Sequence, residues 1–128
     1  MSEPLLIDTD VIIDYLRGQV DAVSYIEGLT NPLLISVITV AELYSGVREG
    51  DERKALDRFI SAFQLVQVDE AIAVKGGVYR RDYGKSDGLG LADALIAATA
   101  DAASASLITL NRKHFPMLAS VKIPYTKT

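Results

Sequence analysis

The sequence predicts an α/β protein, a three-layer sandwich in which a central parallel sheet of about five strands lies between helices. Short apolar runs alternate with longer amphipathic segments along the whole chain. The apolar runs are continuous, as is typical of strands buried on both faces. Strands that alternate with helices favour parallel pairing through right-handed crossovers. With 128 residues and no linker, repeat or low-complexity tract, we expect residues 1–128 to form a single domain.

The strands are expected in short runs rich in Leu, Ile and Val, which cover residues 4–7, 33–37, 65–68, 106–109 and 121–124. The helices are expected in the amphipathic segments, which cover residues 10–17, 20–28, 40–48, 52–63, 70–83 and 91–104. Gly18 and Gly28 stand where the first two helices should end.

The later helices have recognisable starts. Thr39, Asp51 and Asp69 occupy N-cap positions. The glycine-rich stretch 83–90 is expected to form a flexible loop before the segment 91–104. Because that segment is almost entirely Ala, Leu and Ile, it should be buried against the sheet.

Composition excludes several classes of protein. No apolar run approaches the roughly 20 residues that a membrane span needs, and the N-terminus carries no signal-peptide pattern. The absence of cysteine excludes disulfides and thiolate metal sites, and we expect a cytoplasmic protein. A net charge of −4 argues against broad nonspecific binding of nucleic acid. This charge is compatible with an enzyme that binds phosphate groups through metal ions and a few local cations.

Four polar residues stand where predicted strands end or helices begin. Asp8 and Asn111 follow two of the strands, and Glu42 and Asp93 fall in first helical turns. In a parallel sheet the ligand site lies beyond the carboxyl ends of the strands, so the four side chains should converge. Clustered carboxylates repel one another unless a cation balances them. With His114 as the single histidine and no cysteine, the pattern predicts a site for Mg²⁺ or Mn²⁺.

Each of these residues also has an ordinary structural interpretation. Asp8 is a favoured N-cap, Glu42 fits a capping box with Thr39, and Asp93 suits the helix dipole. Asn111 fits the cap of a short turn. Asp93 is the hardest to explain in this way, because its apolar helix offers no Lys or Arg as a partner. We therefore expect Asp8 and Asp93 to be metal ligands and Glu42 to be catalytic.

Neighbouring residues receive weaker predictions. The hydroxyls of Thr9 and Thr109 are expected next to the site, where they could orient a bound water or contact substrate. Arg112 is placed to contact a phosphate. Asp10 is expected to accept a hydrogen bond behind the ligands, whereas Asp14 is expected to be solvated.

Four segments resemble, in order and spacing, the motifs of PIN-domain proteins, especially the VapC-type toxins of bacterial toxin–antitoxin pairs. These are residues 6–18 (LIDTDVIIDYLRG), 36–46 (SVITVAELYSG), 90–100 (GLADALIAATA) and 107–115 (LITLNRKHF). The resemblance spans the whole chain, and any one motif alone would be weak.

This resemblance implies a PIN-like fold and a Mg²⁺- or Mn²⁺-dependent endoribonuclease that leaves a 5′-phosphate and a 3′-hydroxyl. It also implies a homodimer, held inactive by a small cognate antitoxin, that can enter a larger toxin–antitoxin assembly. The first three acids of the family map onto Asp8, Glu42 and Asp93. Where a fourth acid often stands, this chain has Asn111. The number of bound metal ions, one or two, therefore stays open. Asn111 and Arg112 are candidate substrate contacts.

For the dimer contact, the aromatic residues Tyr44, Phe63 and Tyr79 are expected to be exposed and are candidate interface groups. The RNA target and the identity of the antitoxin are not specified by any of these patterns.

A haloacid-dehalogenase-like phosphatase is an alternative, because Asp8-Thr9-Asp10 also resembles the DxD motif of that family. There Asp8 would be the phosphorylated nucleophile and Asp10 an acid or base. No later paired-acid motif is present, and the length leaves no room for a cap domain.

Two non-catalytic alternatives stay open. A phospho-receiver domain would use the acids after the first strand together with Asp69, Thr109 and Lys122, but it would leave Glu42 and Asp93 without roles. A PIN scaffold without activity is the other, since one acid of the family pattern is missing.

Overall fold

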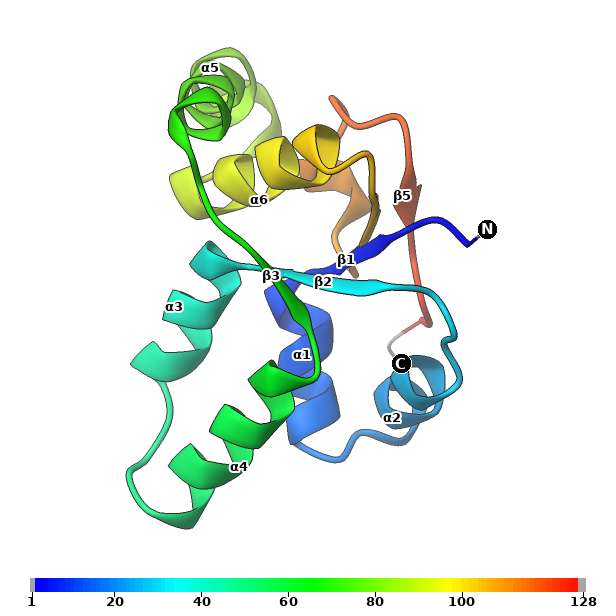
Figure 1. Cartoon of the computed structure of the whole chain (residues 1–128). Helices are drawn as coiled ribbons and strands as arrows, with labels where there is room; N and C mark the ends of the chain where they lie inside the picture. Colours follow the sequence, from blue (N-terminus) through cyan, green and yellow to red (C-terminus); the bar gives the residue numbers. More distant parts are fainter. Residues whose placement is uncertain (1, 127–128) are drawn as a thin grey trace.

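The computed structural model describes residues 2–126, and its centre is a parallel sheet of five strands in the order β3-β2-β1-β4-β5 (Figure 1). The strands are β1 (Leu5–Ile7), β2 (Leu33–Ser36), β3 (Gln64–Val66), β4 (Ser106–Ile108) and β5 (Val121–Lys122). All neighbouring strands pair in parallel. The predicted sheet is therefore confirmed, with strands shorter than the apolar runs from which they were predicted.

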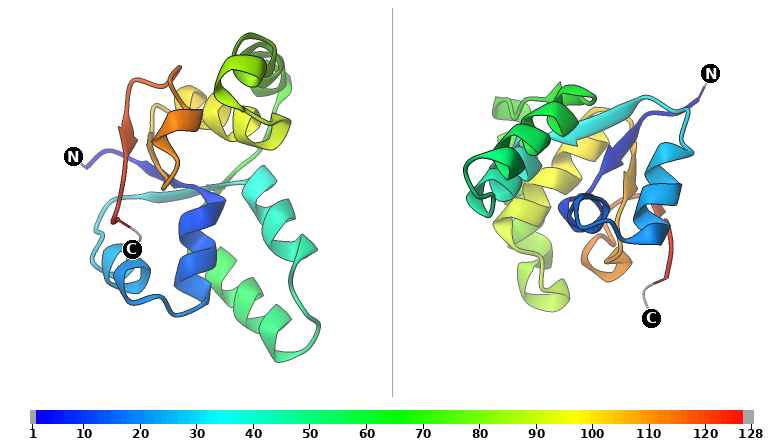
Figure 2. Two further views of the ribbon diagram at one scale, coloured as in Figure 1. Left: turned by 180° about the vertical axis from the view of Figure 1, so that it is seen from behind. Right: turned by 90° about the horizontal axis from the view of Figure 1, so that it is seen from below.

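The helices are α1 (Thr9–Leu16), α2 (Val20–Glu27), α3 (Val37–Ser45), α4 (Asp51–Ser61), α5 (Glu70–Asp87), α6 (Leu91–Ala102) and a short 3₁₀ helix, η1 (Arg112–His114). Figures 1 and 2 show α1 to α4 on one face of the sheet and α5 and α6 on the other. Within residues 2–126 no helix is long and apolar enough to span a bilayer.

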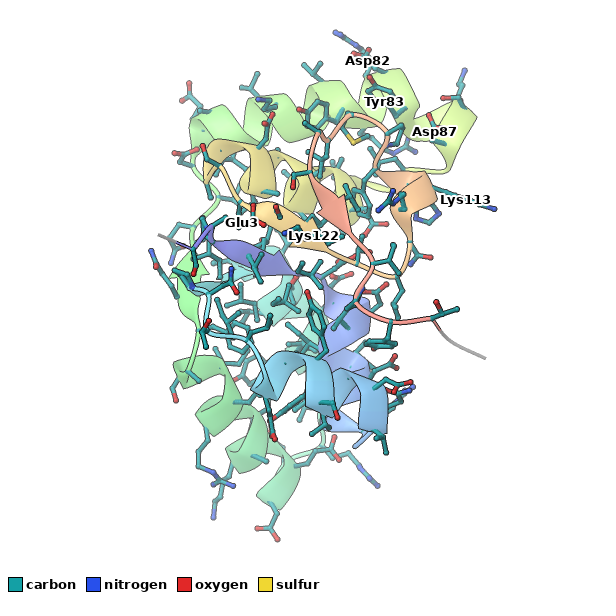
Figure 3. The ribbon with its side chains drawn as sticks, turned by 90° about the vertical axis from the view of Figure 1, so that its right-hand side faces the viewer. Glu3, Asp82, Tyr83, Asp87, Lys113 and Lys122 are labelled. Carbon is teal, nitrogen blue, oxygen red and sulfur yellow. The ribbon has the colours of Figure 1, made fainter. Side chains whose placement is uncertain are left out.

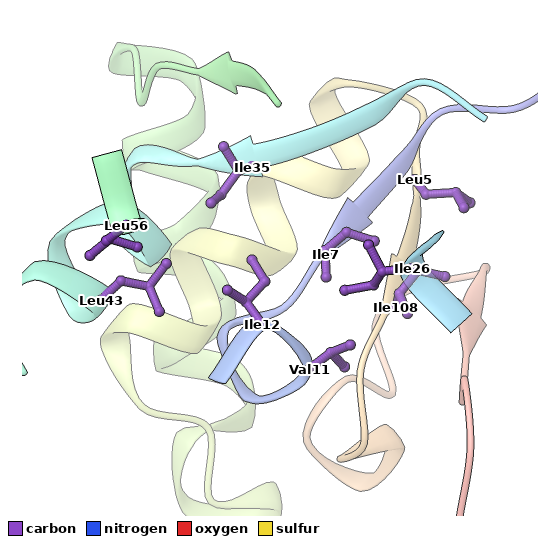
Figure 4. Packing of buried hydrophobic residues seen from close by; sticks show 9 residues of the cluster. All are labelled: Leu5, Ile7, Val11, Ile12, Ile26, Ile35, Leu43, Leu56 and Ile108. Carbon is purple, nitrogen blue, oxygen red and sulfur yellow. The ribbon is translucent and has the colours of Figure 1, made fainter. Parts of the chain in front are cut away.

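Two apolar cores hold these layers together, because successive strand residues point to opposite faces. The core under α1 to α4 contains Leu5, Ile7, Val11, Ile12, Ile26, Ile35, Leu43, Leu56 and Ile108 (Figure 4). The core under α5 and α6 contains Leu6, Leu34, Leu89, Ala94, Ile96, Ala97, Ala100, Leu107 and Phe115. Burial on both faces explains why the strands read as continuous apolar runs.

The chain order marks the carboxyl end of β1 as the place where a ligand site is expected. The connections from β1 to β2 and from β2 to β3 run over one face, and the connection from β3 to β4 crosses the other. The strand order thus reverses between β1 and β4, and ligands of open α/β sheets bind at such a reversal.

Helix α3 begins earlier than predicted. It starts at Val37 because Ser36 is its N-cap, and the Ser36 hydroxyl accepts a 3.0 Å hydrogen bond from the amide of Ile38. Thr39 is therefore a buried residue inside the helix, and its predicted capping role is wrong. Glu42 lies in the second turn, so the predicted capping box is wrong as well.

The other helix boundaries differ less. Asp51 is the first residue of α4, one position after its N-cap Gly50. Asp69 caps α5 as predicted, with Oδ1 accepting a 2.9 Å bond from the amide of Ile72. The predicted loop over 83–90 is wrong for its first half, because α5 continues to Asp87 and ends at Gly88, where φ is 69°.

Candidate active site

Asp8 lies at the carboxyl end of β1, directly before α1. It is the N-cap of α1, as predicted, and its Oδ1 accepts a 2.8 Å bond from the amide of Thr9. Its own amide donates to the carbonyl of Ile108 in β4 at 2.9 Å. With the residue only 5% exposed, these contacts fix the carboxylate between β1 and β4.

Thr109 holds the second oxygen of that carboxylate. Its buried hydroxyl donates to Asp8 Oδ2 at 2.7 Å and accepts from the amide of Asn111 at 3.1 Å. Thr109 was predicted beside the site. Its full burial means that it acts on Asp8 rather than at the surface.

The electrostatics at Asp8 oppose its ionisation. Burial raises the pKa of Asp8 to about 7, the negative charge of Asp10 adds to the rise, and Asp93 adds a smaller part. The hydrogen bonds from Thr109 and Thr9 act in the opposite direction. A cation bound beside Asp8 would favour the ionised form of its carboxyl group.

Asp10 ties α1 to the segment that follows β4. Its Oδ1 accepts from the amide of Val11 at 2.8 Å. Its Oδ2 accepts from the amide of Leu110 at 3.1 Å and from Asn111 Nδ2 at 3.2 Å. Asp10 thus accepts hydrogen bonds, while its predicted role behind the metal ligands stays a prediction. Asn111 turns its side chain to Asp10 and makes no side-chain cap on η1.

Glu42 approaches the residue next to Asp8 from α3. Its Oε1 accepts a 2.7 Å hydrogen bond from the hydroxyl of Thr9, which lies 3.0 Å from the hydroxyl of Thr39. Glu42 itself is exposed. Thr9 therefore connects Glu42 to Asp8, through its hydroxyl on one side and its amide on the other.

Asp93 lies in the first turn of α6, as predicted, and has a partner that the sequence did not reveal. His114 Nδ1 in η1 lies 3.6 Å from Asp93 Oδ2. The helix itself contains no Lys or Arg. The actual neighbour comes from 21 residues later, and the only sequence signal for it is the polar stretch after β4.

The two cations after β4 differ in their surroundings. Arg112 Nη2 donates to the carbonyl of Val121 in β5 at 3.0 Å, so part of its guanidinium supports the sheet edge. Lys113 projects outward from η1 into solvent (Figure 3).

The carboxylates suit a cation that keeps most of its water ligands, and they do not form a complete set of protein ligands around an ion. Within residues 2–126, no three side chains of His, Cys, Asp or Glu form a group that could hold a metal ion. Mg²⁺ is commonly bound through only one or two carboxylates and keeps several waters. Asp8 and Asp93 offer oxygen donors of this kind, and the pKa of Asp8 is raised mainly by burial, with smaller contributions from the charges of Asp10 and Asp93. These residues therefore fit a single hydrated divalent ion.

Asp14 is not solvated, contrary to the prediction. It is 6% exposed, and its Oδ2 accepts a 2.8 Å bond from the hydroxyl of Tyr125. Burial and this bond raise the pKa of Tyr125. The sequence pattern does not predict this pair, because the two residues are 111 positions apart in the chain.

The residues required by a phospho-receiver have other partners. Asp69 caps α5, and Lys122 pairs with Glu3 at the start of the chain (Figure 3). These contacts favour structural roles for both side chains.

The aromatic residues expected at an interface are partly buried within the chain. The hydroxyl of Tyr44 bonds Asp57, Phe63 packs on Phe59 with ring centroids 4.9 Å apart, and the hydroxyl of Tyr79 donates to Asp101 at 2.8 Å. The expectation that they are exposed is therefore wrong.

Two recesses adjoin the site. A groove of about 540 Å³ runs between α1, α3 and α4 and has Glu42 in its wall. A smaller hollow of about 420 Å³ lies beside Asp10 and Asn111, under the segment that follows β5.

Comparison with known proteins gives consistent results. The family model of the PIN domain matches residues 5–119. Ribonuclease VapC10 of Mycobacterium tuberculosis is 41% identical over 124 residues, which are 94% of this chain and 92% of that protein. Ribonuclease VapC19 of the same species is also 41% identical, over 94% of this chain and 98% of that protein. The solved structure of a toxin–antitoxin complex from Klebsiella pneumoniae contains a chain with a TM-score of 0.82 and 30% identity, covering 94% of this chain and 98% of that one.

Proposed function

The chain belongs to the PIN-domain family, and from this premise we propose that it is a Mg²⁺- or Mn²⁺-dependent endoribonuclease, the toxin of a toxin–antitoxin pair. The names of its relatives, VapC10 and VapC19, support ribonuclease activity. The observation that carries the proposal is the buried Asp8, whose pKa is raised to about 7 beside Asp10 and Asp93. Crowded oxygen donors at a strand-order reversal are what a divalent cation and a phosphate would need.

In this proposal Asp8 and Asp93 hold one cation. When bound, such an ion lowers the pKa of a bound water and offsets charge on the phosphate. The amide of Thr9 and the hydroxyl of Thr109 keep the Asp8 carboxylate in one orientation. Asn111 faces Asp10 rather than Asp8, which favours one ion over two.

Glu42 is proposed to orient the attacking water and to accept its proton. The hydroxyl of Thr9 holds Oε1 at 2.7 Å, so the carboxylate keeps a fixed direction although it is exposed. The exposed Lys113 and the free part of the Arg112 guanidinium are proposed to contact a neighbouring phosphate. Thr9 and Asn111 then border the bound strand.

The test is RNA cleavage by the purified chain in Mg²⁺, in Mn²⁺ and in EDTA. Asp8→Asn, Glu42→Gln and Asp93→Asn should each lower the cleavage rate by about a hundred-fold or more. Asp101→Asn is the matched control, because Asp101 is on the same helix as Asp93 but pairs with Lys75 and Tyr79. Full activity of folded Asp8→Asn and Asp93→Asn would overturn the assignment. Calorimetry distinguishes an inactive scaffold, which would show no Mn²⁺ binding that depends on Asp8 and Asp93.

The cognate antitoxin is proposed to occupy the groove between α1, α3 and α4. Its floor is apolar, and its rim carries charges of both signs; the lining is Ile13, Leu16, Arg17, Glu42, Leu43, Gly46, Val47, Arg48, Glu52, Ala55 and Leu56. An amphipathic helix fits such a groove. A helix seated there would also cover Glu42, so one contact would both bind the antitoxin and block cleavage. The structure from Klebsiella pneumoniae, titled a toxin–antitoxin complex, supports a partner of this kind.

We also propose a cytoplasmic homodimer. Val74 and Val78, one turn apart on α5, are 61% and 37% exposed, and Leu91 at the start of α6 is exposed as well. Aliphatic side chains at this spacing form one face of a helix. Size-exclusion chromatography with light scattering should give a dimer for the wild type and a monomer for Val74→Glu. An unchanged dimer would place the interface elsewhere.

A further inference from the structure

The hydroxyl of Thr9 lies between α1 and α3 and has two polar neighbours there. Its Oγ1 is 2.7 Å from Glu42 Oε1 and 3.0 Å from Thr39 Oγ1. Thr9 is the first residue of α1, whereas Thr39 and Glu42 are three positions apart on α3 and share one face of that helix. A single hydroxyl of α1 therefore contacts two side chains on the same face of α3.

The number of available protons fixes the direction of these hydrogen bonds. A hydroxyl carries one proton, and an ionised carboxylate accepts but cannot donate. The Thr9 proton is therefore the one that is donated to Glu42. Since that proton is used, the 3.0 Å contact is a hydrogen bond when Thr39 donates to the Thr9 oxygen. The three groups form a chain in which Thr39 donates to Thr9 and Thr9 donates to Glu42.

Burial commits the Thr39 hydroxyl to this chain. Thr39 is 0% exposed, and among residues 2–126 the Thr9 hydroxyl is its only hydrogen-bond neighbour. Thr99 is equally buried in a helix, but its hydroxyl donates to the carbonyl of Leu95 one turn earlier in α6. Such a bond to the helix's own backbone is common for threonine. The Thr39 hydroxyl instead bonds a side chain of another helix, next to the candidate active site.

A donor beside the Thr9 oxygen controls where the proton of Thr9 points. A Thr9 proton turned toward Thr39 would meet the proton of that hydroxyl, which leaves the direction toward Glu42. Accepting a hydrogen bond also polarises the Thr9 hydroxyl and strengthens the bond that it donates. Threonine in a helix has two open χ1 rotamers, and the contact with Thr39 favours one of them. Glu42 is exposed, so its orientation depends on this bond.

From this geometry we propose that Thr39 is a positioning residue, which holds the Thr9 hydroxyl toward Glu42 and so keeps the Glu42 carboxylate in the orientation that cleavage requires. The inference rests on the proposed ribonuclease function and adds a buried residue that contacts neither the RNA nor the cation. It also directs the Thr9 proton to Glu42 rather than to the substrate.

The experiment compares two substitutions of Thr39 in steady-state cleavage, in Mg²⁺, of an RNA oligonucleotide that the wild type cuts. Thr39→Val keeps the shape of the side chain and removes its hydroxyl. It should lower kcat by about five- to ten-fold and leave KM unchanged, because the orientation of Glu42 matters in the transition state. Thr39→Ser keeps the hydroxyl and should retain kcat to within about two-fold, although the lost methyl group lowers its stability.

Thr99→Val is the matched control, because it removes a buried helix hydroxyl that bonds only the backbone of α6. It should lose stability and keep kcat. In a Glu42→Ala background, Thr39→Val should leave the residual cleavage rate unchanged, since its hydroxyl acts through that carboxylate. Melting temperatures verify folding, and Thr39→Ala replaces Thr39→Val if the latter does not fold. A wild-type kcat in folded Thr39→Val, or the same fold-loss with and without Glu42, would overturn the inference and leave the nuclease function standing.

Failure of the proposed function is recognised separately. In that case the wild type shows no Mg²⁺-dependent cleavage that Asp8→Asn abolishes. NMR of protein with ¹³C-labelled threonine methyl groups then tests the positioning itself, without metal or RNA. Three-bond couplings to the Thr9 methyl carbon should report one χ1 rotamer in the wild type and in Thr39→Ser, and averaged rotamers in Thr39→Val. That result would support the positioning of Thr9 by Thr39. Averaged rotamers in the wild type, or one rotamer retained in Thr39→Val, would overturn it.

Discussion

The hydroxyl of Thr109 donates a 2.7 Å hydrogen bond to Oδ2 of Asp8 and so joins the ends of β4 and β1. Both residues are buried, and each directly follows one of two neighbouring parallel strands. The position of Asp8 therefore depends on a residue 101 positions later in the chain.

Replacing Thr109 by Val keeps the shape of the side chain and removes this hydrogen bond. The Asp8 carboxylate loses a donor, so its pKa should rise further, and the amide of Asn111 loses its acceptor. We expect weaker Mn²⁺ binding by calorimetry and a loss of about 1–3 kcal/mol in the free energy of unfolding. Thr99→Val is the control, because the Thr99 hydroxyl is also buried but bonds the carbonyl of Leu95 within α6. Equal Mn²⁺ affinity in the two variants would contradict the role of Thr109.

The stability of the metal-free protein should fall as pH rises. The pKa of Asp8 is about 7 in the folded chain, against an ordinary value of 3.8. Between these values the folded state binds more protons than the unfolded state, so the free energy of unfolding decreases with pH, by up to about 1.4 kcal/mol per unit. Asp8→Asn removes this contribution and should flatten the profile obtained by urea titration between pH 4 and 8. Identical slopes for the two proteins would show that burial does not raise this pKa. Saturating Mn²⁺ should also flatten the wild-type profile.

Close packing of α5 on α6 makes two adjacent glycines respond in opposite directions. A Cβ at Gly76 would lie 2.6 Å from Leu95 Cδ2 and 3.2 Å from its Cα, whereas Gly77 has no atom within 4 Å of that position. Gly76→Ala should therefore destabilise the protein by about 1–3 kcal/mol. Gly77→Ala should stabilise it by about 0.5–1 kcal/mol, because alanine favours a helix. Both are measured by urea unfolding, and a stable Gly76→Ala protein would mean that α6, which carries Asp93, can shift.

Charge in the groove should separate antitoxin binding from cleavage. Leu16 lines the groove and is 42% exposed, so Leu16→Glu should leave the fold intact and oppose the docking of an apolar helix face. We expect at least a ten-fold weaker affinity for the cognate antitoxin, with RNA cleavage unchanged. Val20→Glu is the control, since Val20 is more exposed and does not line the groove. Antitoxin binding equal to that of the wild type would place the partner on another surface.

The fold was predictable because its signals are local. Buried parallel strands read as apolar runs, and Asp69 marked a helix start through the same hydrogen bond that it makes in the structure. The start of α3 was missed because Ser36 belongs both to β2 and to the cap, so the apolar run hid the boundary. The extent of α5 was missed because glycine within residues 83–90 suggested a loop, whereas packing against α6 overrides that weak preference.

For the candidate site, the sequence predicts which residue types it contains and at which strand or helix ends they lie, but not their partners. The positions of Asp8 and Asp93 followed from the rule that parallel strands open at one edge. The partners of these side chains did not follow, because they are set by tertiary contacts. His114 meets Asp93 from η1, and Tyr125 meets Asp14 from the end of the chain. No spacing pattern encodes such contacts.

The hydrogen bonds that complete Asp8 also set an order of events during synthesis. Its amide and carboxylate are bound by Ile108 and Thr109, which leave the ribosome long after β1. The segment after β4 also supplies two hydrogen bonds to Oδ2 of Asp10. A nascent or truncated chain that ends before β4 lacks every one of these contacts. In the proposed function, the chain therefore forms its active site only after β4 and Thr109 have been synthesised.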